Sequence, residues 1–163
     1  MKDGVVQQVD TPQNLYNMPG NLFVAGFIGS PQMNFMDAEV KVEGQDVFVT
    51  TGGSKLKVPA EKAQAIIDGG YDGKTIVLGI RPEDVHDEEA FVKANPNSTI
   101  SAPVRVYELL GAEVFLYFDF AGTQMTARVN PKTPARAGDT VKFALDMSKT
   151  HYFDKETQLT IVD

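Results

Sequence analysis

From residue 35 onward, apolar and polar side chains alternate over short stretches, which is the period-2 pattern of half-buried β-strands. This pattern predicts strands at residues 36–42, 46–50, 55–58, 75–80, 100–109, 113–120, 124–129, 140–145 and 159–162. Turn residues separate several of them, at Glu43-Gly44-Gln45, Thr51-Gly52-Gly53 and Ala121-Gly122-Thr123. Most of the chain is therefore expected to fold as antiparallel sheet.

Two further patterns refine this expectation. The segment 113–120 is apolar on both faces, so it is expected to be a central strand. Residues 61–67 have the spacing of a short amphipathic helix, and Asp68-Gly69-Gly70 would end it. The predicted fold class is mainly β, an OB-like small barrel or sandwich with short helices, because many short strands joined by glycine turns are typical of that class.

The N-terminal segment, residues 1–31, has a different pattern. Residues 4–9 resemble a short strand, and Thr11 can cap a helix that has Pro12 at its first position. Pro19-Gly20 would stop this helix, and residues 21–28 have the spacing of a second one. The N-terminal segment is predicted to be a helical remnant of another domain.

The break at Gly29-Ser30-Pro31 sets the predicted boundary, between residues 1–31 and an OB-like domain at 32–163. Two small helices and one strand cannot bury the large apolar side chains of the N-terminal segment. These are Leu15, Tyr16, Phe23 and Phe27. The N-terminal segment therefore has the character of the end of a larger domain.

Composition narrows the classes of function. The formal net charge of −7 argues against a nucleic-acid surface and against docking on anionic lipid, since both need clustered Lys and Arg. The absence of cysteine excludes disulfides, thiolate metal sites and cysteine nucleophiles, and fits a reducing cytoplasm. No apolar run reaches the roughly 20 residues of a membrane span, and the start of the chain lacks the apolar region of a signal peptide.

Four stretches resemble the ATP-binding subunits of sugar-import ABC transporters, the maltose and multiple-sugar family. The first runs from Gly4-Val5-Val6-Gln7-Gln8-Val9 through Thr11-Pro12 to residues 23–35, and it closes the nucleotide-binding domain in that family. Leu78-Gly79-Ile80-Arg81-Pro82-Glu83 resembles the signature of the transport-associated OB (TOBE) domain. Residues 104–110 with Gly111, and His151-Tyr152-Phe153-Asp154 with Thr157, are similar to later parts of the same domain.

The resemblance implies a regulatory and dimerisation module of a carbohydrate importer, cytoplasmic and peripheral on the inner face of the membrane. Its partners would be a second copy, the upstream nucleotide-binding domain, the membrane permease subunits through that domain, and, in some bacteria, a phosphotransferase-system regulator. The alternative is an OB-like domain that binds small oxyanions, as related molybdate-binding domains do. The net charge of −7 disfavours this alternative.

No enzymatic activity is expected of this chain, and no cofactor, catalytic or metal residue is assigned. Proteins of this family need a loop G-x-x-x-x-G-K-[ST] to surround the phosphates of ATP. The resemblance implies that the full-length parent protein holds ATP and magnesium. Gly73-Lys74-Thr75 supplies the end of such a loop, but Asp68 stands where the leading glycine is required. We interpret Gly73-Lys74-Thr75 as a turn.

Three other patterns could indicate a functional site, but each has a simpler structural explanation. Residues 83–89 gather five carboxylates and His86, which suits a hard-cation site, a general-base cluster or a solvated acidic loop, and we favour the loop. His151 stands far from His86 and is taken as a packing or surface residue. The aromatic residues of 115–120 could stack nucleic-acid bases, but without flanking Lys and Arg they indicate core packing.

Arg81 is the principal candidate residue. Pro82 restrains its backbone to an extended conformation just after an apolar strand, where its guanidinium could hold a carboxylate. Glu83 and Glu108 are both open as that carboxylate. We favour a structural role over a direct contact with a partner. The structural and regulatory candidates are Arg81, Pro82, Glu83, Gly111, Gly29 and Pro31.

Overall fold

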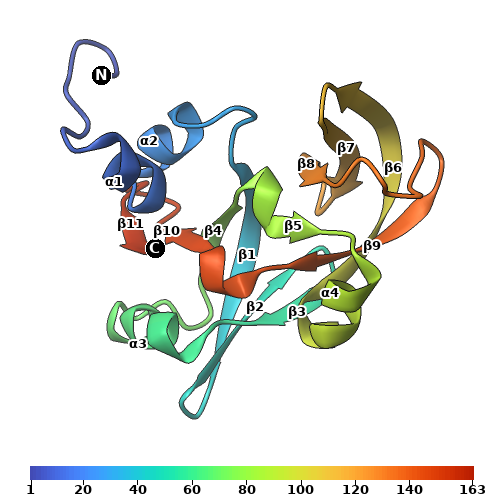
Figure 1. Cartoon of the computed structure of the whole chain (residues 1–163). Helices are drawn as coiled ribbons and strands as arrows, with labels where there is room; N and C mark the ends of the chain where they lie inside the picture. The colour runs from blue at the N-terminus through green and yellow to red at the C-terminus, as the bar shows by residue number, and fades with distance from the viewer.

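The computed structural model describes residues 1–163 and consists of two antiparallel sheets with short helices between their strands (Figure 1). The first sheet has the order β11-β10-β4-β1-β2-β3, and the second has the order β5-β9-β6-β7-β8. The strands are β1 (Asn34–Glu43), β2 (Asp46–Thr51), β3 (Ser54–Lys57), β4 (Thr75–Ile80), β5 (Val85–His86), β6 (Thr99–Leu110), β7 (Glu113–Phe120), β8 (Thr123–Val129), β9 (Thr140–Leu145), β10 (His151–Phe153) and β11 (Thr160–Val162). The fold is mainly β and OB-like, as expected from the sequence.

Four α-helices and three single turns of 3-10 helix complete the chain. The helices are α1 (Pro12–Asn17), α2 (Leu22–Phe27), α3 (Ala60–Asp68) and α4 (Glu89–Ala94), and the turns are η1 (Pro82–Asp84), η2 (Pro96–Ser98) and η3 (Met147–Lys149). In Figure 1, α1 and α2 lie beside β10 and β11, on the opposite side of the molecule from β6, β7 and β8. No helix is long and apolar enough to cross a membrane.

The inward faces of both sheets, together with α3, form one apolar core of 27 buried residues. Phe118 of β7 stacks on Phe143 of β9 with 4.3 Å between ring centres. Asn34, at the start of β1, joins the first sheet to the free edge of β8: its side-chain amide donates to the Thr126 carbonyl and accepts from the Thr126 N–H, each at 2.8 Å. Because Asn34 is buried, this pair satisfies polar groups that water does not reach.

The strand pattern was a reliable guide from residue 35 onward. Strands β4, β7 and β9 have the predicted bounds, and β7 lies between β6 and β8, so its central position is confirmed. Phe115, Phe118 and Phe120 are buried, which confirms core packing and excludes an exposed stacking platform for these three rings. Gly73 lies in the turn before β4, as interpreted from the sequence.

One predicted strand is absent from the structure, and two strands and one helix were missed. Residues 4–9 do not form a strand; a single bridge joins Lys2 and Val5, and no neighbouring strand is available to pair with the rest. Strands β5 and β10, with two and three residues, were missed because so short a segment has no visible period. Helix α4 was also missed. The division of the chain between residues 31 and 32 stays a prediction.

Candidate functional site

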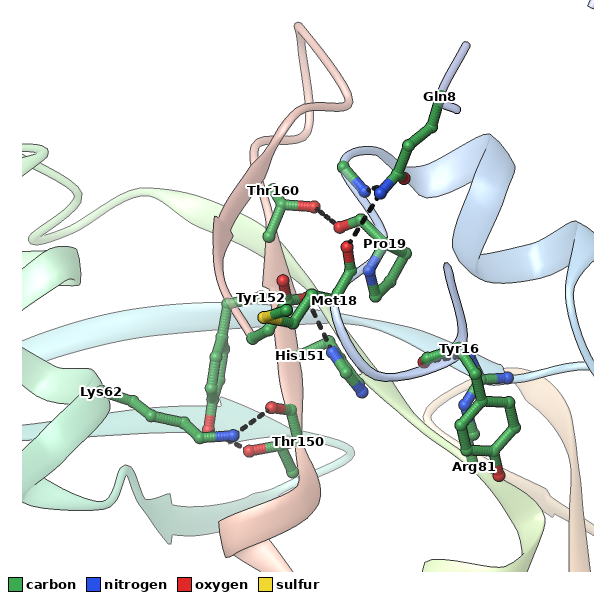
Figure 2. Close-up of polar contacts among 12 residues, drawn as sticks. Gln8, Tyr16, Met18, Pro19, Lys62, Arg81, Thr150, His151, Tyr152 and Thr160 are labelled. Atoms are coloured by element: carbon green, nitrogen blue, oxygen red, sulfur yellow. Dashed lines mark hydrogen bonds and ion pairs between the residues drawn. The ribbon is translucent and has the colours of Figure 1, made fainter. Parts of the chain in front are cut away.

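The candidate site centres on Arg81, directly after β4. Its side chain is buried, with 2% of the residue exposed. Nη1 donates to the carbonyl of Ile28 at 2.8 Å, and Nη2 donates to the carbonyl of Tyr16 at 2.7 Å. The guanidinium carbon also lies 3.8 Å from the centre of the Tyr16 ring (Figure 2). A single side chain thus holds two separate parts of the N-terminal segment.

The location of these carbonyls explains the arrangement. Ile28 is the C-terminal cap of α2, and Tyr16 belongs to the last turn of α1. The final carbonyls of a helix have no partner within the helix, and they carry the negative end of its dipole. Arg81 supplies both the donors and the positive charge. It therefore acts as a shared cap for two helices that have no basic residue in their own last turns.

The expected carboxylate partner of Arg81 was wrong. No carboxylate lies within ion-pair distance of its guanidinium. Glu83 instead accepts a hydrogen bond from the Tyr16 hydroxyl and lies 3.9 Å from Arg128 Nη2, and Glu108 faces the hydroxyl of Tyr117 at 3.4 Å. The guanidinium binds the helix-end carbonyls because these carbonyls have no other donor, whereas both carboxylates have a tyrosine hydroxyl as partner.

Burial shifts the pKa values around this cluster. Burial lowers the pKa of the Arg81 guanidinium, and nearby Glu83 and Asp84 oppose the shift. Burial, together with the hydrogen bond to Glu83, raises the pKa of Tyr16 to about 12. The pKa of Asp84 rises from 3.8 to about 6, first because the carboxyl is buried and second because Glu83 and Asp146 are close.

A second set of contacts fixes the N-terminal segment to the end of the chain (Figure 2). Thr160 Oγ1 donates to the Pro19 carbonyl at 2.5 Å, and its N–H donates to the Gly20 carbonyl at 3.1 Å. Leu22 N–H donates to the Gln158 carbonyl at 2.9 Å. A small apolar cluster separate from the main core also joins α2 to β10, and it consists of Ala25, Met33, Val77 and Phe153.

A polar pocket of about 300 Å³ opens beside Arg81. It is lined by Tyr16 and Asn17 of α1, by Arg81, Glu83 and Asp84, by Lys62 of α3, and by Ser148, Lys149, His151 and Asp163. Lys62 Nζ donates to the Thr150 carbonyl at 2.6 Å, and His151 Nδ1 lies 2.8 Å from an Asp163 carboxylate oxygen (Figure 2 shows Lys62 and His151). The pocket therefore lies where the N-terminal segment, α3 and β10 meet.

The remaining candidate residues divide between this region and the rest of the fold. Gly29 is part of it: its φ is +105°, and a Cβ there would come within 2.9 Å of Arg81 Nη1. Pro82 begins η1, which packs on β8, and Pro31 follows a cis peptide bond on the way into β1. Gly111 lies apart, in the turn between β6 and β7 with φ +61°.

The acidic run 83–89 contains no group of three side chains arranged to hold a metal ion. It is also less solvated than expected. Asp87 accepts a hydrogen bond from the Thr133 hydroxyl, and His86 stacks on Phe91 with 4.0 Å between ring centres. Burial raises the pKa of Asp87. The run thus contributes local packing as well as exposed charge.

Sequence reasoning missed Lys62, Thr160 and the hydrogen-bonding role of Tyr16. Lys62 reaches a carbonyl 88 residues away, and Thr160 reaches one 141 residues away. A lysine on a short amphipathic helix and a threonine in a short strand are ordinary surface residues by pattern. Only the chain's three-dimensional path brings them to the junction.

Comparison with known proteins shows which families this chain resembles. The family model described as the MalK OB fold domain matches residues 29–85, and the TOBE domain model matches residues 78–153. The oligosaccharides import ATP-binding protein MsmX of Bacillus subtilis is 42% identical over 99% of this chain. The multiple sugar-binding transport ATP-binding protein MsmK of Streptococcus mutans is 40% identical over 97% of it. The chain spans only 43% and 41% of these two relatives.

A solved structure of the cytoplasmic molybdate-binding protein ModG has a similar fold, with a TM-score of 0.56 over 73% of this chain and 94% of that one. Its 16% identity limits the likeness to architecture. The two family models overlap at 78–85, the stretch that contains Arg81, and together they run from the end of α2 to β10. The chain therefore belongs to the family of MalK OB-fold and TOBE domains, which its relatives carry within the ATP-binding proteins of sugar importers.

Proposed function

We propose that the chain is the regulatory and dimerisation module of the ATP-binding subunit of a carbohydrate ABC importer. One observation carries the proposal: the N-terminal segment is held to the β-sheets and still leaves large apolar side chains exposed. Arg81 and Thr160 hold the segment through hydrogen bonds to its carbonyls. The exposed apolar residues are Val5, Val6, Val9, Met18 and Phe27, the last with 68% of its surface accessible.

Exposed apolar side chains of this kind are a feature of surfaces that bind another protein. We assign them to contacts with the nucleotide-binding domain of the parent protein and with a second copy of the chain. Through that domain the module would act on the permease subunits at the cytoplasmic face of the membrane. A regulator such as a phosphotransferase-system protein would alter transport by binding one arrangement of the subunits better than another.

Self-association is the first experimental test. Sedimentation velocity of the chain over a concentration series should show a monomer–dimer equilibrium. A species that stays monomeric at about 100 μM would contradict the dimerisation part of the proposal, since weaker association releases less than about 5.5 kcal/mol. The regulatory part is tested separately, by adding the chain in trans to the importer and measuring its ATPase rate.

The module itself is proposed to lack ATP binding, with ATP and magnesium held by the rest of the parent protein. The turn at Gly73 leads into a strand, whereas a phosphate loop opens a helix whose N–H groups surround the phosphates. Calorimetric titration with Mg-ATP should show no saturable heat. Micromolar binding would overturn this assignment.

A further inference from the structure

The pocket beside Arg81 is polar and balanced in charge. Of its ten lining residues only Tyr16 is hydrophobic, and the lining contains three Lys or Arg side chains and three Asp or Glu side chains. An apolar ligand would find little surface to pack on. An anion or a cation would meet as many like charges as opposite ones. The composition of the lining therefore favours a neutral polar molecule.

Several hydrogen-bonding groups of the lining have no partner within the protein. The half-buried Asp84 carboxylate accepts no hydrogen bond and forms no ion pair, and the side-chain amide of Asn17 is free as well. Lys149 has no ion pair, and Lys62 has ammonium hydrogens beyond the one that it donates to the Thr150 carbonyl. Acceptors and donors thus stand free in the same pocket.

We propose that this pocket binds a neutral polyhydroxylated molecule, a free sugar or polyol. Each hydroxyl group both donates and accepts, so one molecule can donate to Asp84 and accept from Lys62 and Lys149. The bond to Asp84 is the strongest of these, because a hydrogen bond to a charged acceptor is about twice as strong as one between neutral groups. A volume of about 300 Å³ admits a molecule of monosaccharide size.

The position of the pocket gives such binding a consequence. Asn17 is the last residue of α1, whereas Asp84 and Lys149 end the turns η1 and η3. A molecule that bonds to Asn17 and to either of the other two residues joins the N-terminal segment to the β-sheets. Its binding then stabilises the docked arrangement of that segment. This inference does not depend on dimerisation or on the compound that the parent protein transports.

The test uses glucose as the first probe and sorbitol as the second. Backbone amide shifts of the full chain are followed by NMR at pH 7.5 during each titration. Saturable shifts at Asn17, Asp84 and Lys149, with a dissociation constant of about 50 mM or lower for either probe, support the site. Glycine and sulfate are the charged comparisons. Tighter binding of either one at these residues, or no saturable shift with glucose and sorbitol, would overturn the proposal.

Variants assign the effect to the pocket. Asn17→Ala should weaken binding about threefold, through the loss of one neutral hydrogen bond. Asn97→Ala is the matched control, at another exposed asparagine that has no side-chain hydrogen bond and lies outside this pocket, and it should change nothing.

Asp84→Asn should weaken binding about threefold to tenfold, because an amide oxygen accepts less strongly than a carboxylate. The variant is expected to fold, since burial disfavours the charged carboxylate that it removes. Equal affinities in Asn17→Ala and Asn97→Ala, or an unchanged affinity in Asp84→Asn, would mean that the shifts arise elsewhere and that the proposed site is wrong.

Discussion

Arg81 and Gly29 occupy adjoining space at the junction of the N-terminal segment and the barrel. Gly29 adopts φ +105°, and a Cβ on it would stand 2.9 Å from Arg81 Nη1. The same guanidinium nitrogen donates to the carbonyl of Ile28, the residue before Gly29. Absence of a side chain at one position thus allows the hydrogen bond made by the other. The two residues, far apart in the sequence, form one structural unit.

Arg81→Ala should destabilise the chain. The substitution leaves the carbonyls of Ile28 and Tyr16 without their donor and removes the contact with the Tyr16 ring. We expect a loss of about 1–3 kcal/mol in the free energy of unfolding, measured by urea denaturation at equal m-value. Arg105→Ala is the control, since Arg105 is exposed and pairs only with Asp119; it should cost within about 0.5 kcal/mol.

Arg81→Lys should recover only part of this loss. A single ammonium cannot reach two carbonyls in the fixed geometry of the guanidinium, and it does not reproduce the contact with an aromatic ring. Its urea midpoint should lie between those of the wild type and Arg81→Ala. A midpoint of Arg81→Ala equal to that of the wild type would remove the capping role altogether.

Gly29→Ala should destabilise the chain more than a substitution at an uncrowded glycine. Both the positive φ and the approach to Arg81 oppose a Cβ at this position. Gly138→Ala is the matched control, because Gly138 has φ +93° but no atom within 4 Å of the added Cβ. Backbone strain alone should cost Gly138→Ala about 1–2 kcal/mol. Thermal unfolding of both variants checks the order, and equal losses would show that Arg81 moves away without penalty.

Asp84 should make the folded chain more stable in mild acid than a carboxyl group with an ordinary pKa at this position would. Its pKa in the folded protein, about 6, is higher than its ordinary value of 3.8, so the folded state binds the proton more tightly than the unfolded state does. The stabilising contribution of the neutral carboxyl is complete below pH 3.8. It is lost as the pH rises through about 6.

Asp84→Asn therefore should be more stable than the wild type at pH 7.5, by about 1 kcal/mol after allowance for solvent screening. The difference should shrink toward pH 4.5. Urea midpoints over this pH range provide the measurement, with Asp3→Asn as a control at an exposed carboxyl. A constant difference at all pH values would mean that protonation of Asp84 is not the cause.

Phe27→Asp should weaken self-association without reducing the stability of the monomer. Phe27 is 68% exposed on α2, so the substitution removes little buried apolar surface from the monomer while placing a charge in the proposed contact patch. Leu110→Asp is the comparison, at an exposed apolar residue beside the turn between β6 and β7. If Leu110→Asp alone abolishes the dimer in sedimentation velocity, the contact lies on the second sheet and our assignment of the surface is wrong.

Most of the β-structure could be predicted because strands are encoded locally. The alternation of apolar and polar residues in 36–42 and 124–129 specifies which faces are buried. The continuous apolar runs in 75–80 and 113–120 indicate strands that are covered on both faces. The turn at Gly122 is also encoded locally, because Gly122 adopts a positive φ and stands between two strand patterns. Segments of two or three residues, such as β5 and β10, have no such period and emerge only from pairing.

The sequence alone thus determined the strand segments, the family resemblance and the importance of Arg81. The tertiary structure decided what Arg81 binds. Nearby carboxylates in the sequence suggested an ion pair, whereas the helix ends at Tyr16 and Ile28, much earlier in the chain, provide the acceptors. The same holds for the pocket, whose cations Lys62, Arg81 and Lys149 come from separate elements. Contacts between distant segments depend on the global packing of the chain, and a local pattern does not contain them.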